Sequence, residues 1–86
     1  MSLTHILVIG PRCWGKGESL KQAIMRARVN YFGGPMPYVA YSVPADAWVD
    51  GDGAICWADG SIEIRKIRRA SLKDGKIKVE VIDEPA

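Results

Sequence analysis

The feature that most limits the fold of this chain is a series of aspartate–glycine turns in its second half. The turns are Asp50-Gly51-Asp52-Gly53, Asp59-Gly60 and Asp74-Gly75. Asp-Gly pairs adopt the left-handed backbone of tight hairpin turns, and β-branched and aromatic residues are frequent between them. The second half therefore predicts short antiparallel strands joined in hairpins. After the last turn, apolar residues at 77, 79 and 81 alternate with polar ones, as in a strand with one buried face.

The first half predicts one strand and one helix. The apolar, β-branched run from Thr4 to Ile9 indicates a buried strand that ends at the following glycine. Ser19 and Gln22 have the spacing of a capping box, and apolar residues then recur at helical spacing, which predicts a helix over 19–32. We expect the apolar side of this helix to face both the N-terminal strand and the alternating C-terminal strand, because that packing buries their apolar faces.

With 86 residues, of which 48% are hydrophobic and 26% charged, the chain has the composition of one globular domain spanning 1–86. The expected fold class is α+β: a single helix packed on a mainly antiparallel sheet of about five strands, in the order β-α-β-β-β-β. This length excludes doubly wound nucleotide-binding folds and enzymes with a cleft between two domains. The apolar run near the N-terminus is far shorter than the ~20 residues of a membrane helix, so we expect no membrane partner. Two cysteines are too few for a disulfide scaffold, which favours a cytoplasmic protein.

The net charge of +2 conceals blocks of opposite sign. Residues 46–63 hold five acidic side chains and no basic one, whereas residues 64–78 hold seven basic side chains and one acidic. This alternation indicates a bipolar surface rather than the single basic face of a dedicated nucleic-acid-binding protein. Solvated charges on hairpin strands explain the same blocks equally well.

The segment from Gly10 to Gly17 matches the pattern G-x-x-x-x-G-K of a phosphate-binding loop. Gly17 stands where such a loop has the serine or threonine that ligates magnesium, so we expect no nucleotide hydrolysis. Anion binding by Lys16 and the backbone of Gly15 and Gly17 is a weaker alternative to a purely structural loop.

The sequence offers no pattern for catalysis or metal binding. His5 is the only histidine, and Cys13 and Cys56 are isolated, whereas structural zinc needs four ligands in paired spacing. No combination of nucleophile, base and carboxylate suggests a triad or a carboxylate dyad. We therefore expect a non-enzymatic protein with no catalytic residues, no cofactor and no metal.

Macromolecular binding accounts best for the remaining features. The basic hairpin 65–78 contains a cluster suited to phosphates or to the rim of a protein interface: Arg65, Lys66, Arg68 and Arg69. Trp14 and Trp48 lie in or beside predicted turns, where exposed tryptophans serve as protein-binding hot spots, whereas we expect Trp57 to anchor the core. Because carboxylates around tryptophans repel a phosphate backbone, protein binding is preferred and nucleic-acid binding is the alternative. A homodimer formed through an edge strand is a further alternative.

Two segments carry a resemblance to known proteins. They are Trp14-Gly15-Lys16-Gly17-x-Ser19-Leu20-x-x-Ala23 and Val49-Asp50-x-x-Gly53-x-Ile55-x-Trp57. Together they resemble small orphan proteins encoded by tailed phages and prophages. The resemblance implies an accessory protein in the host cytoplasm that binds, or inhibits, a host protein or defence complex, and it transfers no functional residue.

Overall fold

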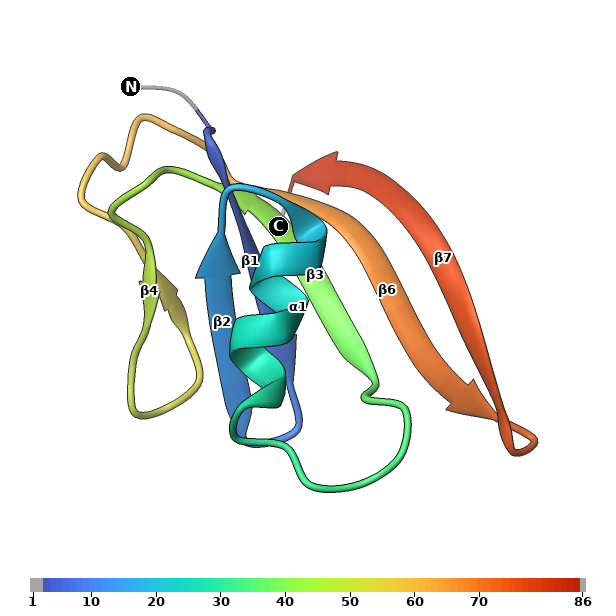
Figure 1. The fold of residues 1–86 in the computed structure, drawn as a ribbon. Coiled ribbons are helices and arrows are strands. Elements are labelled where there is room, and N and C mark those ends of the chain that lie inside the picture. Colours follow the sequence, from blue (N-terminus) through green and yellow to red (C-terminus); the bar gives the residue numbers. More distant parts are fainter. Residues whose placement is uncertain (1–2, 86) are drawn as a thin grey trace.

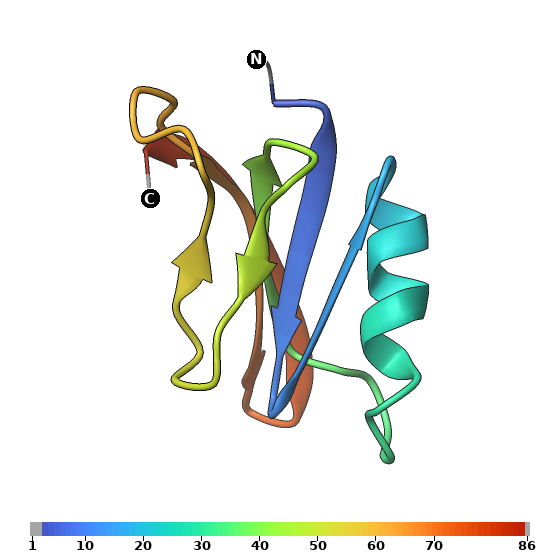
Figure 2. The ribbon, with the colours of Figure 1, turned by 90° about the vertical axis from the view of Figure 1, so that its left-hand side faces the viewer.

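The computed structural model describes residues 3–85, which form three layers. Figure 2 shows helix α1 (Leu20–Arg28) on one face of a central sheet and a small β-hairpin on the other. The sheet is antiparallel, with the strand order β2-β1-β3-β6-β7. Its strands are β1 (His5–Gly10), β2 (Cys13–Gly17), β3 (Tyr38–Val43), β6 (Arg65–Lys73) and β7 (Lys76–Pro85). The hairpin consists of β4 (Trp48–Val49) and β5 (Ile55–Cys56).

The predicted class, one helix on an antiparallel sheet of five strands, is confirmed, but the chain order differs (Figure 1). The segment predicted as a glycine loop contains strand β2, so the chain begins β-β-α rather than β-α. The strands around the Asp50 turn are not part of the main sheet and pair only with each other. The predicted turn at Asp74-Gly75 is confirmed, and both residues have the positive φ of a tight hairpin turn, 54° and 76°.

The helix begins as predicted and ends earlier. The Ser19 hydroxyl accepts a hydrogen bond from the Gln22 amide at 3.2 Å, and Gln22 Oε1 accepts one from the Glu18 amide at 2.8 Å. The last helical residue is Arg28 rather than residue 32. Val29 follows as the cap, and β-branched residues such as valine are weak helix formers.

The sheet is apolar on both faces, which we call the helix side and the hairpin side. The helix-side core consists of Val8, Cys13, Ala23, Ala27, Met36 and Ala40. The hairpin-side core consists of Leu7, Val43, Ala47 and Ile64. Leu7 and Val8 are both fully buried because successive strand residues point to opposite faces. This is why the run around them is continuously apolar rather than alternating.

Strands β6 and β7 continue beyond the covered part of the sheet as an arm, residues 71–81, in which every residue is exposed (Figure 1). The prediction that the helix packs against Ile77, Val79 and Val81 is wrong. The helix lies over β2 and β1, at the opposite edge of the sheet, and these side chains remain 38%, 51% and 74% exposed. Within residues 3–85, no helix is long and apolar enough to cross a membrane.

Candidate functional site

The turn between β1 and β2 holds a non-glycine residue in an uncommon backbone conformation. Gly10 pairs with Cys13, and between them Arg12 has a φ of 58°. Pro11 occupies the first central position of the turn, where its ring fixes φ. Arg12 occupies the second central position, which requires a left-handed backbone and is usually a glycine. An arginine there costs about 1–2 kcal/mol. This turn keeps the exposed Arg12 at the rim of a cavity.

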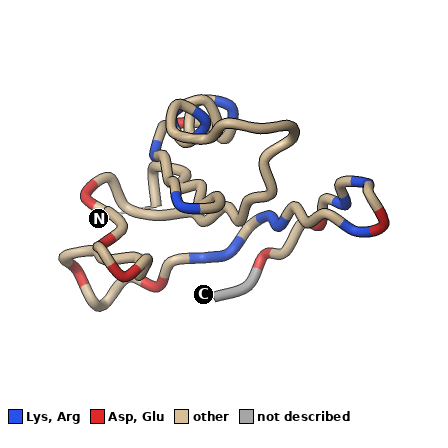
Figure 3. Tube along the Cα trace, turned by 90° about the horizontal axis from the view of Figure 1, so that it is seen from below, with Lys and Arg blue, Asp and Glu red and all other residues tan. Residues whose placement is uncertain are grey.

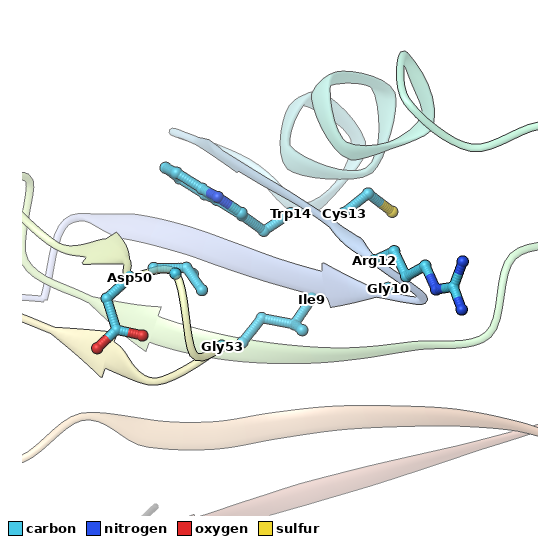
Figure 4. Close-up of a pocket in the computed structure, with 9 residues that line it drawn as sticks. Ile9, Gly10, Arg12, Cys13, Trp14, Asp50 and Gly53 are labelled. Atoms are coloured by element: carbon cyan, nitrogen blue, oxygen red, sulfur yellow. The ribbon is translucent and has the colours of Figure 1, made fainter.

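The cavity has a volume of about 250 Å³ and lies between the β1–β2 turn and the tip of the β4–β5 hairpin (Figure 4). Its lining residues are Ile9, Gly10, Arg12, Cys13, Trp14, Val49, Asp50, Gly51 and Gly53. In Figure 4 the indole of Trp14 and the guanidinium of Arg12 extend in opposite directions from the β1–β2 hairpin. The cavity therefore has Trp14 of the central sheet on one side and the Asp50 turn of the β4–β5 hairpin on the other.

The two tryptophans predicted to be exposed lie on different hairpins, Trp14 on β2 and Trp48 on β4. Trp14 is 39% exposed, and it alternates on β2 with residues that face the helix, so it lies on the hairpin side. Trp48 is 46% exposed, because its neighbour Val49 takes the core-facing position of the short strand. The expectation that Trp57 is a core anchor is confirmed: it packs in the hairpin-side core, and its indole Nε1 donates a hydrogen bond to the Ile62 carbonyl at 2.8 Å.

The carboxylates beside Trp48 hold the turns of this layer in place. Asp50 Oδ1 accepts hydrogen bonds from the amides of Asp52 and Ala54, both at 2.9 Å, and Asp46 Oδ2 accepts one from the Ala58 amide at 3.0 Å. Carboxylates that cap backbone amides in this way fix turns that would otherwise be mobile. The hairpin therefore presents its tryptophan on a preformed acidic surface.

Two further groups in this layer have shifted pKa values. The Ser61 hydroxyl and amide donate to Asp59 Oδ1 at 2.6 and 3.0 Å, and these hydrogen bonds lower the pKa of the Asp59 carboxyl. Partial burial, followed by the charge of Asp50, raises the pKa of the Cys56 thiol. Cys56 is therefore a poor nucleophile at neutral pH, since the thiolate is the reactive form.

The residues predicted to bind an anion lie on strand β2 rather than in a loop, and they make contacts within the protein. Lys16 Nζ donates to the carbonyl oxygens of Ala45 and, at 2.8 Å, of Ala47. An anion at Lys16 would compete with these two hydrogen bonds. Gly15 and Gly17 are buried against α1, where they permit a close approach of helix and strand. Anion binding by Lys16, Gly15 and Gly17 stays a prediction, but the phosphate-cradling loop on which it depended is a strand.

The predicted basic cluster is divided between the two faces of the sheet. Arg65 and Arg68 are opposite Ser42 and Ala40 of β3, which share the helix side, whereas Lys66 and Arg69 are opposite Tyr41 and Val39 on the hairpin side. A β-bulge at Ile67 causes the extra step. Arg65 also contacts Asp83, with 3.4 Å between Nη1 and Oδ1.

The structure groups a different set of basic residues. They share the hairpin side of β6 and β7, and all but the first lie in the arm: Arg69, Lys73, Lys76 and Lys78. Figure 3 shows acidic positions on the β4–β5 hairpin, and both basic and acidic positions along the arm, which contains Asp74 and Glu80 besides its lysines. The sequence signal for this grouping was the alternation of the lysines with Ile77 and Val79.

Among the described residues, no three His, Cys, Asp or Glu side chains are grouped so as to hold a metal ion. Comparison of the chain with protein-family models, with curated proteins and with solved structures found no match.

Proposed function

We propose that this chain is a non-enzymatic binding protein that docks on another protein through two exposed tryptophans: Trp14, which lines the cavity, and Trp48 on the adjacent β4–β5 hairpin. The observation that carries the proposal is that two tryptophans stay exposed, Trp14 at 39% in the lining of the cavity and Trp48 at 46% on the hairpin whose turns are held by carboxylates. Tryptophans dominate the binding energy of protein interfaces because each buries a large area with few rotatable bonds.

The chemistry of the surface suggests the chemistry of its partner. A cavity of about 250 Å³ with Ile9 and Val49 in its wall suits one apolar side chain of the partner. Asp46, Asp50 and Asp52 surround Trp48 in the sequence with negative charge, which favours an arginine or lysine over the indole. We therefore expect a partner segment that combines an apolar anchor with a neighbouring basic residue. In the context of the phage resemblance, that partner would be a protein of the host.

Affinity capture with matched variants tests this proposal. The immobilised wild-type chain, Trp14→Ala, Trp48→Ala and Phe32→Ala are incubated with nuclease-treated lysate of a candidate host. Phe32 is the matched control because it is an aromatic residue, 93% exposed, that lies outside this surface. Proteins held by the wild type and Phe32→Ala but lost by both tryptophan variants support the proposal. Equal retention by all four proteins would contradict it.

Nucleic-acid binding is the second candidate, and one observation favours it. Lys73, Lys76 and Lys78 share one face of the arm that projects from the body of the protein, and Arg69 continues this face on β6. If all four contact phosphates, the logarithm of the affinity for duplex DNA or RNA falls linearly with the logarithm of salt concentration, with a slope of about −3 to −4. We expect weak binding without sequence preference. Submicromolar, sequence-selective binding at about 150 mM salt would instead make this the main function.

A further inference from the structure

Strand β7 is a long sheet edge that nothing in the described chain covers. It is the last strand in the order β2-β1-β3-β6-β7, and no other strand within residues 3–85 pairs with its outer side. Its register with β6 is regular from Lys76 to Val81. The register shift comes after Val81, where β6 has its bulge between Lys66 and Arg68. Natural proteins usually block such edges with a bulge, a proline or an inward-pointing charge, because free backbone groups recruit other strands. Here the regular part of the edge has no bulge and no proline.

The same strand also has one apolar face without a covering layer. Directly opposed residues of β6 and β7 share a face, so Ile77, Val79 and Val81 lie on the helix side, together with Leu72 and Ala70. Leu72, Val79 and Val81 are 67%, 51% and 74% exposed. This apolar strip and the open edge lie on the same strand, so a strand that pairs with the edge would place its own side chains directly beside the strip.

We infer that β7 pairs antiparallel with β7 of a second copy of this chain, around a two-fold axis through Val79 and perpendicular to the sheet. Such an axis keeps the helix sides of both copies on the same side of the joined sheet. Residues that face each other across it then belong to the same face, and the residue on the axis sets the register.

The charges on β7 select that residue. With Val79 on the axis, Val79 faces itself, Ile77 faces Val81, and Lys78 faces Glu80, each of the last two pairs occurring twice. A shift of the axis to Lys78 or to Glu80 places two like charges directly opposite each other, which is destabilising. An axis at Ile77 brings Lys76 against Lys78, and an axis at Val81 brings Val79 against Asp83. Only the register at Val79 combines apolar pairs on the helix side with two opposite-charge pairs on the hairpin side.

The ion pair already present within β7 is compatible with this assembly. Lys78 Nζ lies 3.3 Å from Glu80 Oε1 of the same strand, and both side chains are about half exposed, at 59% and 45%. Exposed pairs of this kind contribute little to folding, so exchanging the two intrachain pairs, one in each copy, for two interchain pairs has a small cost. The dimer would be a continuous ten-stranded sheet made of two five-stranded halves.

Sedimentation equilibrium over a concentration series tests the assembly, with charge variants that test the register. The wild type should reach twice its chain mass of 9.4 kDa. Lys78→Glu and Glu80→Lys each replace two attractive pairs by two repulsive ones, so each should weaken the dimer about tenfold or more. The double variant Lys78→Glu/Glu80→Lys restores the opposite charges and should restore the dimer. Lys73→Glu, on the same face but on β6, is the matched control for a change of charge, and it should dimerise like the wild type.

A crosslink provides a second measurement that does not depend on charge. In a Cys56→Ser background, Val79→Cys should form an interchain disulfide under mild oxidation, because the two side chains meet on the axis, whereas Leu72→Cys on β6 should not. A wild type that stays monomeric at all concentrations would overturn the inference, and so would a dimer that survives Lys78→Glu or fails to crosslink at residue 79. If a different protein covers this edge, the purified wild type would stay monomeric, and the inference would be overturned. The capture experiment on the tryptophan surface is independent of all these outcomes.

Discussion

The close approach of α1 to β2 makes Gly15→Ala the most informative single substitution in this fold. A Cβ at residue 15 would lie 2.5 Å from the carbonyl oxygen of Ala23 and closer still to the backbone nitrogen of Ala27. Real side chains do not tolerate such distances, and both obstacles are backbone atoms of the helix rather than the ends of flexible side chains. The helix as a whole must therefore move away from the strand.

The expected loss follows from what that movement disrupts. Ala23 and Ala27 are fully buried in the helix-side core, so displacing the helix loosens the packing of this cluster. Adding a methyl group to a tightly packed core costs about 1–3 kcal/mol, and we expect about 3 kcal/mol here because backbone has to shift. The total stability of a chain of 86 residues is on the order of 4–13 kcal/mol, so the loss is a large fraction of it.

Urea denaturation followed by tryptophan fluorescence measures this loss, with two other glycines as references. Gly34→Ala adds a methyl group where no atom lies within 4 Å, and its free energy of unfolding should stay within about 0.5 kcal/mol of the wild type. In Gly17→Ala the atoms nearest to the added methyl group belong to the Gln22 side chain, at 2.8–2.9 Å, and the variant should lose about 1 kcal/mol. If Gly15→Ala is no less stable than Gly34→Ala, the packing of helix on strand described above is incorrect.

Three further predictions concern the core, the arm and one carboxylate. Ile24→Ala should lower the free energy of unfolding by about 2 kcal/mol in the same assay, because this partly buried side chain packs against the helix-side core. Val81→Thr should change it by less than about 0.5 kcal/mol at concentrations where the chain is monomeric, since the side chain is 74% exposed; a larger loss would show that the arm is covered. The Asp59 pKa is lowered in the folded state, so its hydrogen bonds with Ser61 stabilise the protein above the ordinary pKa and are lost as the pH falls through the folded value. Ser61→Ala should move the Asp59 pKa up toward that ordinary value in an NMR titration, and an unchanged pKa would contradict this origin of the shift.

The sequence was sufficient for those parts of the fold that depend on neighbouring residues. Ser19 and Gln22 cap the helix as their spacing predicts, and Asp74-Gly75 forms the predicted hairpin turn. Strand β2 was missed because its glycines resemble a flexible loop. In the structure residue 15 has to be a glycine because the backbone of α1 packs directly against it. This contact joins residues far apart in the sequence, so local strand propensity cannot predict it. The alternation of Cys13, Gly15 and Gly17 with larger residues was the available signal.

The surface was predicted less well than the turns. Val79 was correctly placed on the apolar face of a strand, but an apolar face does not say which layer covers it, and the helix lies along β2 and β1 at the other edge of the sheet. The basic residues from 65 to 69 are adjacent in the sequence, yet the bulge and the two-residue period of the strand divide them between faces. Trp14 and Trp48 were expected to be exposed, and both are. The cavity between their layers depends on how the β4–β5 hairpin packs, which the sequence does not specify.

The arm has a consequence for how the molecule opens. Between Ser71 and Val81 every residue is exposed, whereas β1 and β3 lie inside the sheet with fully buried side chains on both faces. In the monomer, amide hydrogens in the arm should therefore exchange with solvent through local unfolding, at a free energy well below that of global unfolding, while those of β1 and β3 exchange only when the whole domain unfolds. Neither core cluster contains a residue of the arm, so both should stay packed when the arm opens. Its length and sequence are consequently free to change without altering the part of the chain that determines the fold.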